Sequence, residues 1–416
     1  MKKIAAFCLL LTVFAASSCS AGSAASVNDS EADGVSSSAS SAPLPTSAPE
    51  ESSFEPVSSQ TDSSQPASSQ TVSLQPVSSQ TPSSQPASPQ ASSAQSVSPQ
   101  KPSTETASTF PEVAETVSGG HYHNNIAAQY SGNVLICGDY ALEYFSVPAA
   151  GNAGYAAMVN AFAAKYPTLN VSCALVPKSC AFHAPKGYAD CSANQQNYIA
   201  NTYAALNASV KRVDAFGTMA AHRDEYLYYR TDHHWTSLGA YYASAAYCSA
   251  NGIVPRGIES YATVVNRGYL GSLYSFSTTS LKEKLRQNLD YTVGHLPQTS
   301  YTMTYQNGGK TYSGTAINKN ANSYAGMFLC GDQPFTDIVT VNQNGRRLMV
   351  FKESYGNAFV PYMIDYYEEI IVVDIRSDKH SAAALISQYG ITDALILNNV
   401  QASVSLAKTL QARLNS

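Results

Sequence analysis

A low-complexity segment fills the first quarter of the chain and confines every candidate core residue to the remaining three quarters. From Ser20 to about Pro111 the sequence consists mainly of Ser, Pro, Gln, Ala and Thr, and Ser-Ser-Gln recurs at positions 58, 68 and 78. A repeat without an apolar face cannot stack into a solenoid and cannot offset the entropy of folding. We therefore expect residues 19–111 to be a disordered linker and residues 112–416 to form one domain.

Apolar runs and segments of helical spacing alternate through that domain. The expected strands are residues 133–137, 170–177, 210–216, 346–352, 370–375 and 394–397. The expected helices are residues 155–166, 197–207, 237–250 (with Thr236 as N-cap), 356–367 and 382–389. Such alternation predicts an α/β fold with a mainly parallel sheet. Residues 256–320, rich in Thr, Tyr, Ser and Gly, fit this pattern less well and are expected to be loops and short strands flanking the site.

The run Asp232-His233-His234-Trp235 places a carboxylate and an imidazole two residues apart. In an extended segment residues i and i+2 point the same way, so Asp232 and His234 share one side and His233 faces the other. One carboxylate can then orient one imidazole. This arrangement is typical of the general base of a hydrolase, which still requires a nucleophile.

Ser354 is the candidate nucleophile. It directly follows the apolar strand expected over residues 346–352 and precedes an expected helix. Functional loops gather beyond the carboxyl ends of strands in open parallel sheets, which suits an exposed hydroxyl there. A serine in this position is also a common helix N-cap, so the context alone leaves both interpretations open.

Several segments between about Asn133 and Val400 resemble the DHHW family, extracytoplasmic proteins similar to the alginate O-acetyltransferases and, more distantly, to SGNH (GDSL-like) hydrolases. The resemblance is carried by Thr-Asp-His-His-Trp-Thr at 231–236, Lys-Glu-Ser-Tyr-Gly-Asn at 352–357, Phe-Val-Pro at 359–361, and residues 369–376 and 394–400. The first of these motifs is highly specific. The resemblance implies an SGNH-like three-layer α/β fold with circularly permuted motif order, in which Asp-x-His precedes Ser.

On this resemblance the catalytic triad is Asp232, His234 and Ser354. Glu353 stands where the family usually carries Asp, but that position is not a triad member. In the related hydrolases an asparagine after a strand donates to the oxyanion. The resemblance gives that role to Asn399, or failing that to Asn398, beside the Ser354 backbone N–H. Each such donor stabilises the transition state by about 3 kcal/mol.

The neighbours of the triad carry two interpretations each. His233 is expected to hold the loop through hydrogen bonds, and Trp235 is expected in the core rather than as a sugar platform. Tyr355 either faces the substrate or anchors the turn. The 28 tyrosines of the chain suit stacking on sugar rings, although most are expected to fill core and surface positions.

The N-terminus indicates export. Two lysines precede an apolar run from Ile4 to Phe14 and then Ser-Ser-Cys19, which predicts a signal peptide over residues 1–18 that is too short to span a membrane. The run resembles a lipobox with Cys19 as the lipidated residue, although Ala16 replaces the commoner Leu, and simple secretion is the alternative. We expect attachment to the outer face of the cytoplasmic membrane through this lipid alone. The linker, with a root-mean-square span of about 50 Å, would let the domain reach into the cell wall.

Six cysteines remain after Cys8 and Cys19. Those at 137, 173 and 330 lie in apolar patterns, where a buried thiol is as good an interpretation as a disulfide. Cys180 and Cys191 flank a short loop and are the predicted disulfide. Its small ring predicts a stabilisation somewhat under about 3 kcal/mol.

The charge of the chain and the spacing of its histidines argue against two further functions, nucleic-acid binding and zinc-dependent hydrolysis. The net charge of −5 without a basic run argues against nucleic-acid binding and against attraction to anionic lipid. His121, His123 and the Asp232–His234 run supply enough ligands for zinc, but their spacing is not that of a helical metalloprotease. We therefore expect no metal and no cofactor, with a metallohydrolase as the third alternative.

The leading hypothesis is a serine-dependent O-acetyltransferase or acetylesterase acting on a cell-surface polysaccharide. Transfer and hydrolysis use the same residues, so the sequence does not separate them. Relatives that resemble this chain often work with a membrane-bound O-acyltransferase, which is the expected acyl donor. The main alternative is a non-catalytic, glycan-binding surface lipoprotein with a vestigial triad.

Overall fold

The computed structural model describes residues 127–416 except 132–133, 139, 189 and 288, and only the backbone at 186, 190–193 and 279–280. The expected signal peptide, the lipidation site at Cys19, the linker, and His121 and His123 therefore lie outside the described residues. No described helix is both long and apolar enough to cross a membrane.

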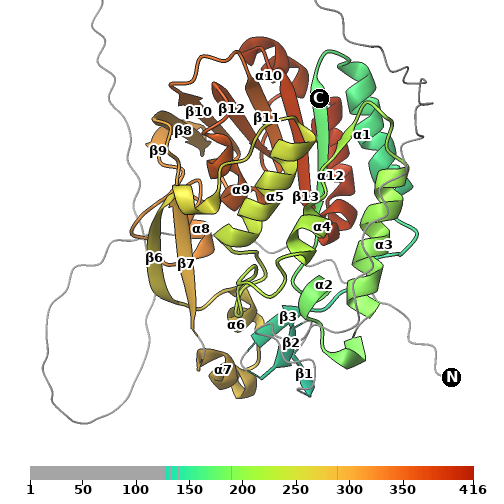
Figure 1. Cartoon of the computed structure of the whole chain (residues 1–416), viewed down its shortest axis with the longest axis vertical. Helices are drawn as coiled ribbons and strands as arrows, with labels where there is room; N and C mark the ends of the chain where they lie inside the picture. Colours follow the sequence, from blue (N-terminus) through green and yellow to red (C-terminus); the bar gives the residue numbers. More distant parts are fainter. Residues whose placement is uncertain (1–126, 132–133, 139, 189, 288) are drawn as a thin grey trace, which may run out of the picture. The chain divides into compact units, whose positions relative to one another are not determined.

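An eight-stranded sheet forms the centre of the domain (Figure 1). Across the sheet the strands run β5 (Lys211–Arg212), β4 (Asn170–Val176), β13 (Asp393–Asn399), β11 (Arg347–Lys352), β12 (Glu369–Asp374), β10 (Phe335–Thr340), β8 (Tyr301–Asn307) and β9 (Lys310–Gly314). The first five are parallel to one another, and the last three join antiparallel. Every residue of β13 is buried, as expected for a central strand covered on both faces.

Two helical layers cover the sheet and complete the three-layer arrangement (Figure 1). One layer holds α1 (Ala153–Lys165), α3 (Asp190–Ala204), α10 (Ala382–Tyr389), α11 (Val400–Ser405) and α12 (Ala407–Asn415). The other holds α4 (Ala215–Ala220), α5 (Ser237–Ala250) and α9 (Gly356–Met363). The predicted fold class, an SGNH-like α/β fold with a mainly parallel sheet, is confirmed.

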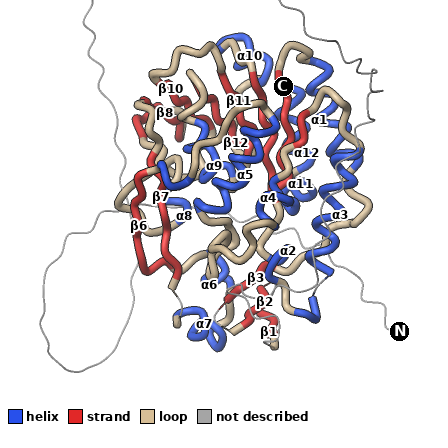
Figure 2. The backbone as a smooth tube through the Cα atoms, in the orientation of Figure 1, coloured by secondary structure: helices blue, strands red, loops and turns tan. Residues whose placement is uncertain are grey.

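Two smaller sheets lie outside the main one (Figure 2). The strand expected at 133–137 is present, but it pairs in an antiparallel sheet of β1 (Ala128–Ser131), β2 (Val134–Cys137) and β3 (Tyr140–Glu143). The segment 256–320 supplies the pair β6 (Ala262–Tyr269) and β7 (Asp290–Leu296), with α6 (Ser272–Phe276) and α7 (Thr279–Arg286) between them. It also supplies β8 and β9, so it is more regular than expected.

The strand expected over 210–216 and the helix expected over 356–367 both end earlier than predicted. Only Lys211–Arg212 of the segment 210–216 forms a strand, because the Asp214 side chain accepts a hydrogen bond from Gly217 N and so begins α4. The helix expected to reach residue 367 ends at Met363. Thr236 is the N-cap of α5, as predicted, and its side chain accepts from Gly239 N.

Among the described cysteines, Cys137, Cys173, Cys248 and Cys330 are free. Burial raises the pKa of the first three thiols to about 12, so they stay protonated and unreactive. Cys180 is disulfide-bonded. The side chain of Cys191 lies outside what the structure describes, so the Cys180–Cys191 pairing stays a prediction.

Candidate active site

Ser354 lies in a tight turn that joins β11 to α9 and is partly exposed while its neighbours are buried. The turn requires glycine at Gly356, because a Cβ there would lie 2.5 Å from the Cβ of Lys352. Among the described groups, none accepts a hydrogen bond from the Ser354 N–H. The turn therefore presents a hydroxyl and a backbone donor together.

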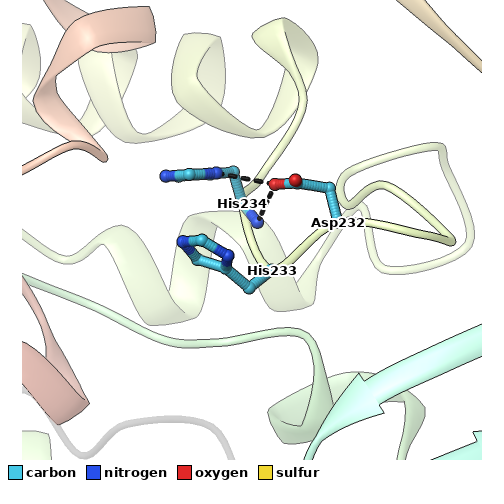
Figure 3. Close-up of side chains that lie close together, drawn as sticks. All are labelled: Asp232, His233 and His234. Atoms are coloured by element: carbon cyan, nitrogen blue, oxygen red, sulfur yellow. Dashed lines mark hydrogen bonds and ion pairs between the residues drawn. The ribbon is translucent and has the colours of Figure 1, made fainter. Parts of the chain in front are cut away.

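Asp232 and His234 lie in the loop before α5, and the Asp232 carboxylate points at the His234 ring (Figure 3). His234 Nδ1 is 2.6 Å from Asp232 Oδ1, and His234 Nε2 is 2.8 Å from Ser354 Oγ. The His234 N–H also donates to Asp232 Oδ1 at 2.9 Å. Carboxylate, imidazole and hydroxyl thus form one hydrogen-bonded row, although Ser354 is 120 residues from His234 in the chain.

The second oxygen of Asp232 is held by the segment between β6 and α6. Tyr269 Oη and the Ser272 N–H each donate to Asp232 Oδ2 at 2.8 Å. The chain can approach this closely because residue 271 is glycine. A Cβ at Gly271 would lie only 2.3 Å from the Cβ of Asp232. Burial would raise the Asp232 pKa, but His234, His233 and these hydrogen bonds hold it well below its usual range. Asp232 is therefore a carboxylate at neutral pH.

Tyr324, in α8 (Tyr324–Met327), fixes the plane of the His234 imidazole. Its ring stacks on His234 with centroids 3.9 Å apart and an interplanar angle of 9°. Its hydroxyl donates to the carbonyl oxygens of Ser354 and Tyr355 at 2.8 and 3.1 Å. One buried tyrosine thus contacts both His234 and the turn that carries Ser354.

The side chains of His233, Trp235 and Tyr355 form hydrogen bonds that hold the loop before α5 and the turn after β11. His233 Nδ1 bonds Ser272 Oγ, and burial, followed by the charge of His234, lowers the His233 pKa to about 3. Trp235 is fully buried and donates through Nε1 to the Tyr355 carbonyl at 3.0 Å. Tyr355 is buried as well and donates through its hydroxyl to the His233 carbonyl. The structure thus places Trp235 in the core and Tyr355 as an anchor of the turn.

The two candidate asparagines at the end of β13 lie in different surroundings. Asn399 lines a pocket beside the serine, and its Oδ1 caps α11 by accepting from Ala402 N at 2.9 Å. Asn398 is buried and accepts from Tyr155 Oη at 2.9 Å. The Glu353 carboxylate accepts a hydrogen bond from the Asn399 N–H at 3.0 Å and so joins β13 to the turn that carries Ser354. Of the two, only Asn399 lines the pocket that holds Ser354.

A polar pocket of about 190 Å³ opens beside the serine. It is lined by Glu143, Lys178, His233, Phe276, Glu353, Ser354, Asn399, Gln401, Ala402 and Ser405. These residues come from β3, the loop after β4, the loop before α5, α6, the turn after β11, the end of β13 and α11. Elements far apart in the sequence therefore build one site at the carboxyl ends of the parallel strands, where such folds bind ligands.

The DHHW family model matches residues 111–373, which is more than half of the chain and includes the whole Asp232–His234–Ser354 row. The chain belongs to the DHHW family. The predicted membership is thereby confirmed.

One solved structure of a DHHW family protein agrees with this assignment. The DHHW family is represented by a crystal structure from Eubacterium siraeum DSM 15702, with a TM-score of 0.64 and 32% identity over 70% of this chain and 99% of that one. Bacillus cereus PatB1 with a sulfonyl adduct has a TM-score of 0.53 at 17% identity, over 66% of this chain and 96% of that one, and shows the fold alone. The O-acetyltransferase domain of Pseudomonas putida AlgJ aligns with a TM-score of 0.38 and 14% identity, over 70% of this chain and 99% of that one. No curated protein shows a significant match.

A metal is the alternative use of the motif in this DHHW chain. Ligand atoms of Asp232, His233 and His234 lie within 4.8 Å of one another. However, Asp232 Oδ1 and both ring nitrogens of His234 already take part in the hydrogen-bonded row. A metal ion would have to break that row, so the geometry fits the serine chemistry better.

Sequence reasoning missed several residues of this site, among them Tyr269, Ser272, Tyr324, Glu143 and Lys178. Tyr269 and Ser272 lie in the segment expected to flank the site, and Gly271 between them was the available sign of a close approach. The others are single residues in ordinary sequence surroundings. Only the fold brings them to the pocket.

Proposed function

We propose that this protein is an extracytoplasmic, serine-dependent O-acetyltransferase or acetylesterase that acts on a cell-surface polysaccharide. The observation that carries the proposal is the continuous hydrogen-bonded row Asp232–His234–Ser354, which ends at a partly exposed hydroxyl in a polar pocket. A serine hydroxyl becomes an effective nucleophile when a neighbouring imidazole accepts its proton and a carboxylate holds that imidazole.

The proposed first half-reaction forms an acetyl-serine. His234 Nε2 accepts the proton of Ser354 Oγ while that oxygen attacks the acetyl carbonyl carbon. The negative charge that develops on the carbonyl oxygen is stabilised by the Ser354 N–H and the side-chain amide of Asn399. When the tetrahedral intermediate collapses, the leaving oxygen takes the proton from His234.

The second half-reaction runs the same steps in reverse. A sugar hydroxyl or water gives its proton to His234 and attacks the acetyl carbon, and Ser354 leaves as the restored hydroxyl. Transfer to a sugar and hydrolysis differ only in which hydroxyl occupies the pocket. The polar lining of the pocket supports an acceptor rich in hydroxyl groups.

A sulfonyl fluoride tests the nucleophile directly, because such reagents modify activated serines. We expect phenylmethylsulfonyl fluoride to add one sulfonyl group to the wild-type protein and to abolish acetate release from an aryl acetate. Peptide mass spectrometry should place the adduct on Ser354, and Ser354→Ala should remain unmodified. Turnover that survives labelling, or that requires a chelatable metal, would contradict the serine mechanism. If the protein binds glycan but turns over no ester, even with a membrane acyl donor supplied, the non-catalytic interpretation wins.

The setting of the reaction is part of the proposal. We propose that Cys19 anchors the protein to the outer face of the membrane and that a membrane-bound O-acyltransferase supplies the acetyl group. This is supported by the lysines, apolar run and Ser-Ser-Cys order at the N-terminus.

The anchor predicts a diacylglyceryl group on Cys19 as the first residue of the mature protein. Mass spectrometry of the exported protein should find this modified N-terminus, and Cys19→Ser should release the protein from the membrane fraction. A free N-terminus at another residue would show simple secretion.

A further inference from the structure

Phe276 is an exposed aromatic side chain that the proposed chemistry does not use. It is the last residue of α6, is 59% exposed, and lines the pocket together with Ser354. Large apolar side chains exposed within a polar site are informative, because burial would otherwise be favoured. A phenyl ring at the rim of such a pocket offers a flat apolar face to a ligand.

The helix that carries this ring is firmly held. Its Ser272 N–H bonds the Asp232 carboxylate, and its Tyr274 N–H bonds the Thr231 carbonyl at 3.1 Å. Leu273 is buried in a small apolar cluster with residues of β2, β3 and α7. Helix α6 also packs against β3, which supplies Glu143 to the same pocket (Figure 1). The helix that carries the ring therefore has a fixed position relative to the triad.

The charged groups of the pocket are two carboxylates and one ammonium: Glu143, Glu353 and Lys178. The ammonium is already occupied, because buried Lys178 forms an ion pair with Glu143 and donates to Gln401 Oε1 at 3.2 Å. Burial would raise the Glu143 pKa, but the neighbouring Lys178 ammonium lowers it, so Glu143 stays ionised at neutral pH. His233, with a pKa of about 3, adds no positive charge at neutral pH. The pocket thus has a net negative charge and no uncommitted cation among its described residues.

We infer that the acceptor or acetylated substrate is an uncharged sugar that stacks on Phe276, and that the pocket disfavours sugars bearing a carboxylate or phosphate. The inference rests on the proposed function and names its substrate class. Sugar C–H groups pack on an aromatic face while the ring hydroxyls bond the Glu143 carboxylate and the Gln401 amide. A uronate would bring a third negative charge next to two carboxylates, and such like-charge repulsion is a common means of excluding a wrong partner.

The charge preference is tested with acetylated xylo-oligosaccharide, which is neutral, and acetylated oligogalacturonate, which is anionic. At low ionic strength the wild type should show a kcat/KM about tenfold higher for the neutral ester, and added salt should narrow the difference by screening. Glu143→Gln, whose amide oxygen still accepts from Lys178, should raise kcat/KM for the galacturonate ester several-fold. A wild type that prefers the anionic ester, or a Glu143→Gln variant that leaves the preference unchanged, would overturn the inference.

The stacking role is tested with Phe276→Ala and Phe276→Tyr. Phe276→Ala should raise KM for the neutral ester about tenfold with little change in kcat. Phe276→Tyr, which keeps an aromatic ring, should have a KM close to that of the wild type. The matched control is Tyr312→Ala, which removes a 43% exposed aromatic ring on β9 that does not line the pocket and should have no effect. A Phe276→Ala variant that behaves like this control would overturn the stacking role.

Failure of the inference is distinguishable from failure of the proposed function. If the wild type hydrolyses neither sugar ester nor 4-nitrophenyl acetate, and transfers no acetyl group to a sugar when a membrane acyl donor is supplied, the proposed function fails. Binding of deacetylated neutral and anionic oligosaccharides to Ser354→Ala, measured by calorimetry, still tests the inference without turnover. Preferential binding of the neutral sugar that weakens about tenfold when Phe276→Ala is added would support it, and equal or stronger binding of the anionic sugar would overturn it.

Discussion

Ser354→Ala should lower kcat for acetyl-ester hydrolysis by about 10⁴-fold or more, because the alanine leaves His234 without a hydroxyl to activate. His234→Ala should have an effect of similar size, since the serine then has no base at 2.8 Å. The double variant should lose little more than either single variant. Residues that act as one unit are not additive, because removing either member already disables the shared step.

The chain supplies a matched control for the base. Asp378 and His380 repeat the Asp-x-His spacing, and His380 Nδ1 lies 2.7 Å from Asp378 Oδ1. No described serine hydroxyl hydrogen-bonds the His380 ring, and His380 does not line the pocket. His380→Ala should therefore keep wild-type turnover. Steady-state kinetics on 4-nitrophenyl acetate, with circular dichroism to confirm folding, measure all four variants.

The comparison with His380 shows what the spacing alone can predict. Asp-x-His in an extended or looped segment places the carboxylate beside the imidazole in both cases, so local geometry explains that contact. It does not predict which pair meets a serine. That step required the strand-to-helix context of Ser354 and the family resemblance. A Ser354→Ala variant with wild-type kcat would mean that the hydrogen-bonded row has no catalytic role.

The fold was predictable where local signals were strong. The buried strands β4, β11, β12 and β13 each contain four consecutive apolar residues, and the Thr236 cap begins α5. Sheet membership was less predictable. The strand β2 is as apolar as its counterparts, but it pairs with β1 and β3 rather than in the main sheet. Strand pairing depends on long-range contacts that one segment does not encode.

The pocket lay beyond sequence reasoning for the same reason. Glu143, Lys178 and Phe276 lie on three separate elements, and none belongs to a motif. Their significance comes from meeting next to Ser354. By contrast, Asn399 could be nominated from its place after an apolar strand, because the chain order of an α/β fold puts such positions at one edge of the sheet.

Asp374→Ala should destabilise the domain by about 3–5 kcal/mol, because it leaves a buried ammonium without its hydrogen-bonded partner. Lys352 and Asp374 lie opposite each other at the ends of β11 and β12, and both side chains are about 1% exposed. Their Nζ and Oδ2 atoms are 2.8 Å apart. The remaining partner of Lys352, Asp332, is 3.8 Å away and is held at 2.9 Å by Arg376. It cannot replace the lost contact without moving.

The pH dependence of this effect is set by the same contacts. Burial would raise the Asp374 pKa, but Lys352 and Arg376 lower it far below that of an unfolded aspartate. A carboxylate whose pKa is lowered by folding stabilises the folded state at any pH above its unfolded pKa of about 3.9. This stabilisation is lost progressively as the pH falls below that unfolded pKa. Urea unfolding should therefore show the largest difference between wild type and Asp374→Ala near neutral pH. The difference should shrink in acid.

A partly buried aspartate on the neighbouring strand β10 gives a control with the opposite sign. Asp337 Oδ1 is buried and has no hydrogen-bond partner among the described groups, and burial, with the charge of Glu369, raises the Asp337 pKa to about 6. Because that carboxylate is unpaired, Asp337→Asn should leave stability at pH 7 unchanged or slightly increased. Its advantage should fade as the pH falls below about 6, where the wild-type group takes up a proton. If Asp374→Ala unfolds at the same urea concentration as Asp337→Asn, the Lys352–Asp374 pair does not stabilise the sheet edge that carries Ser354.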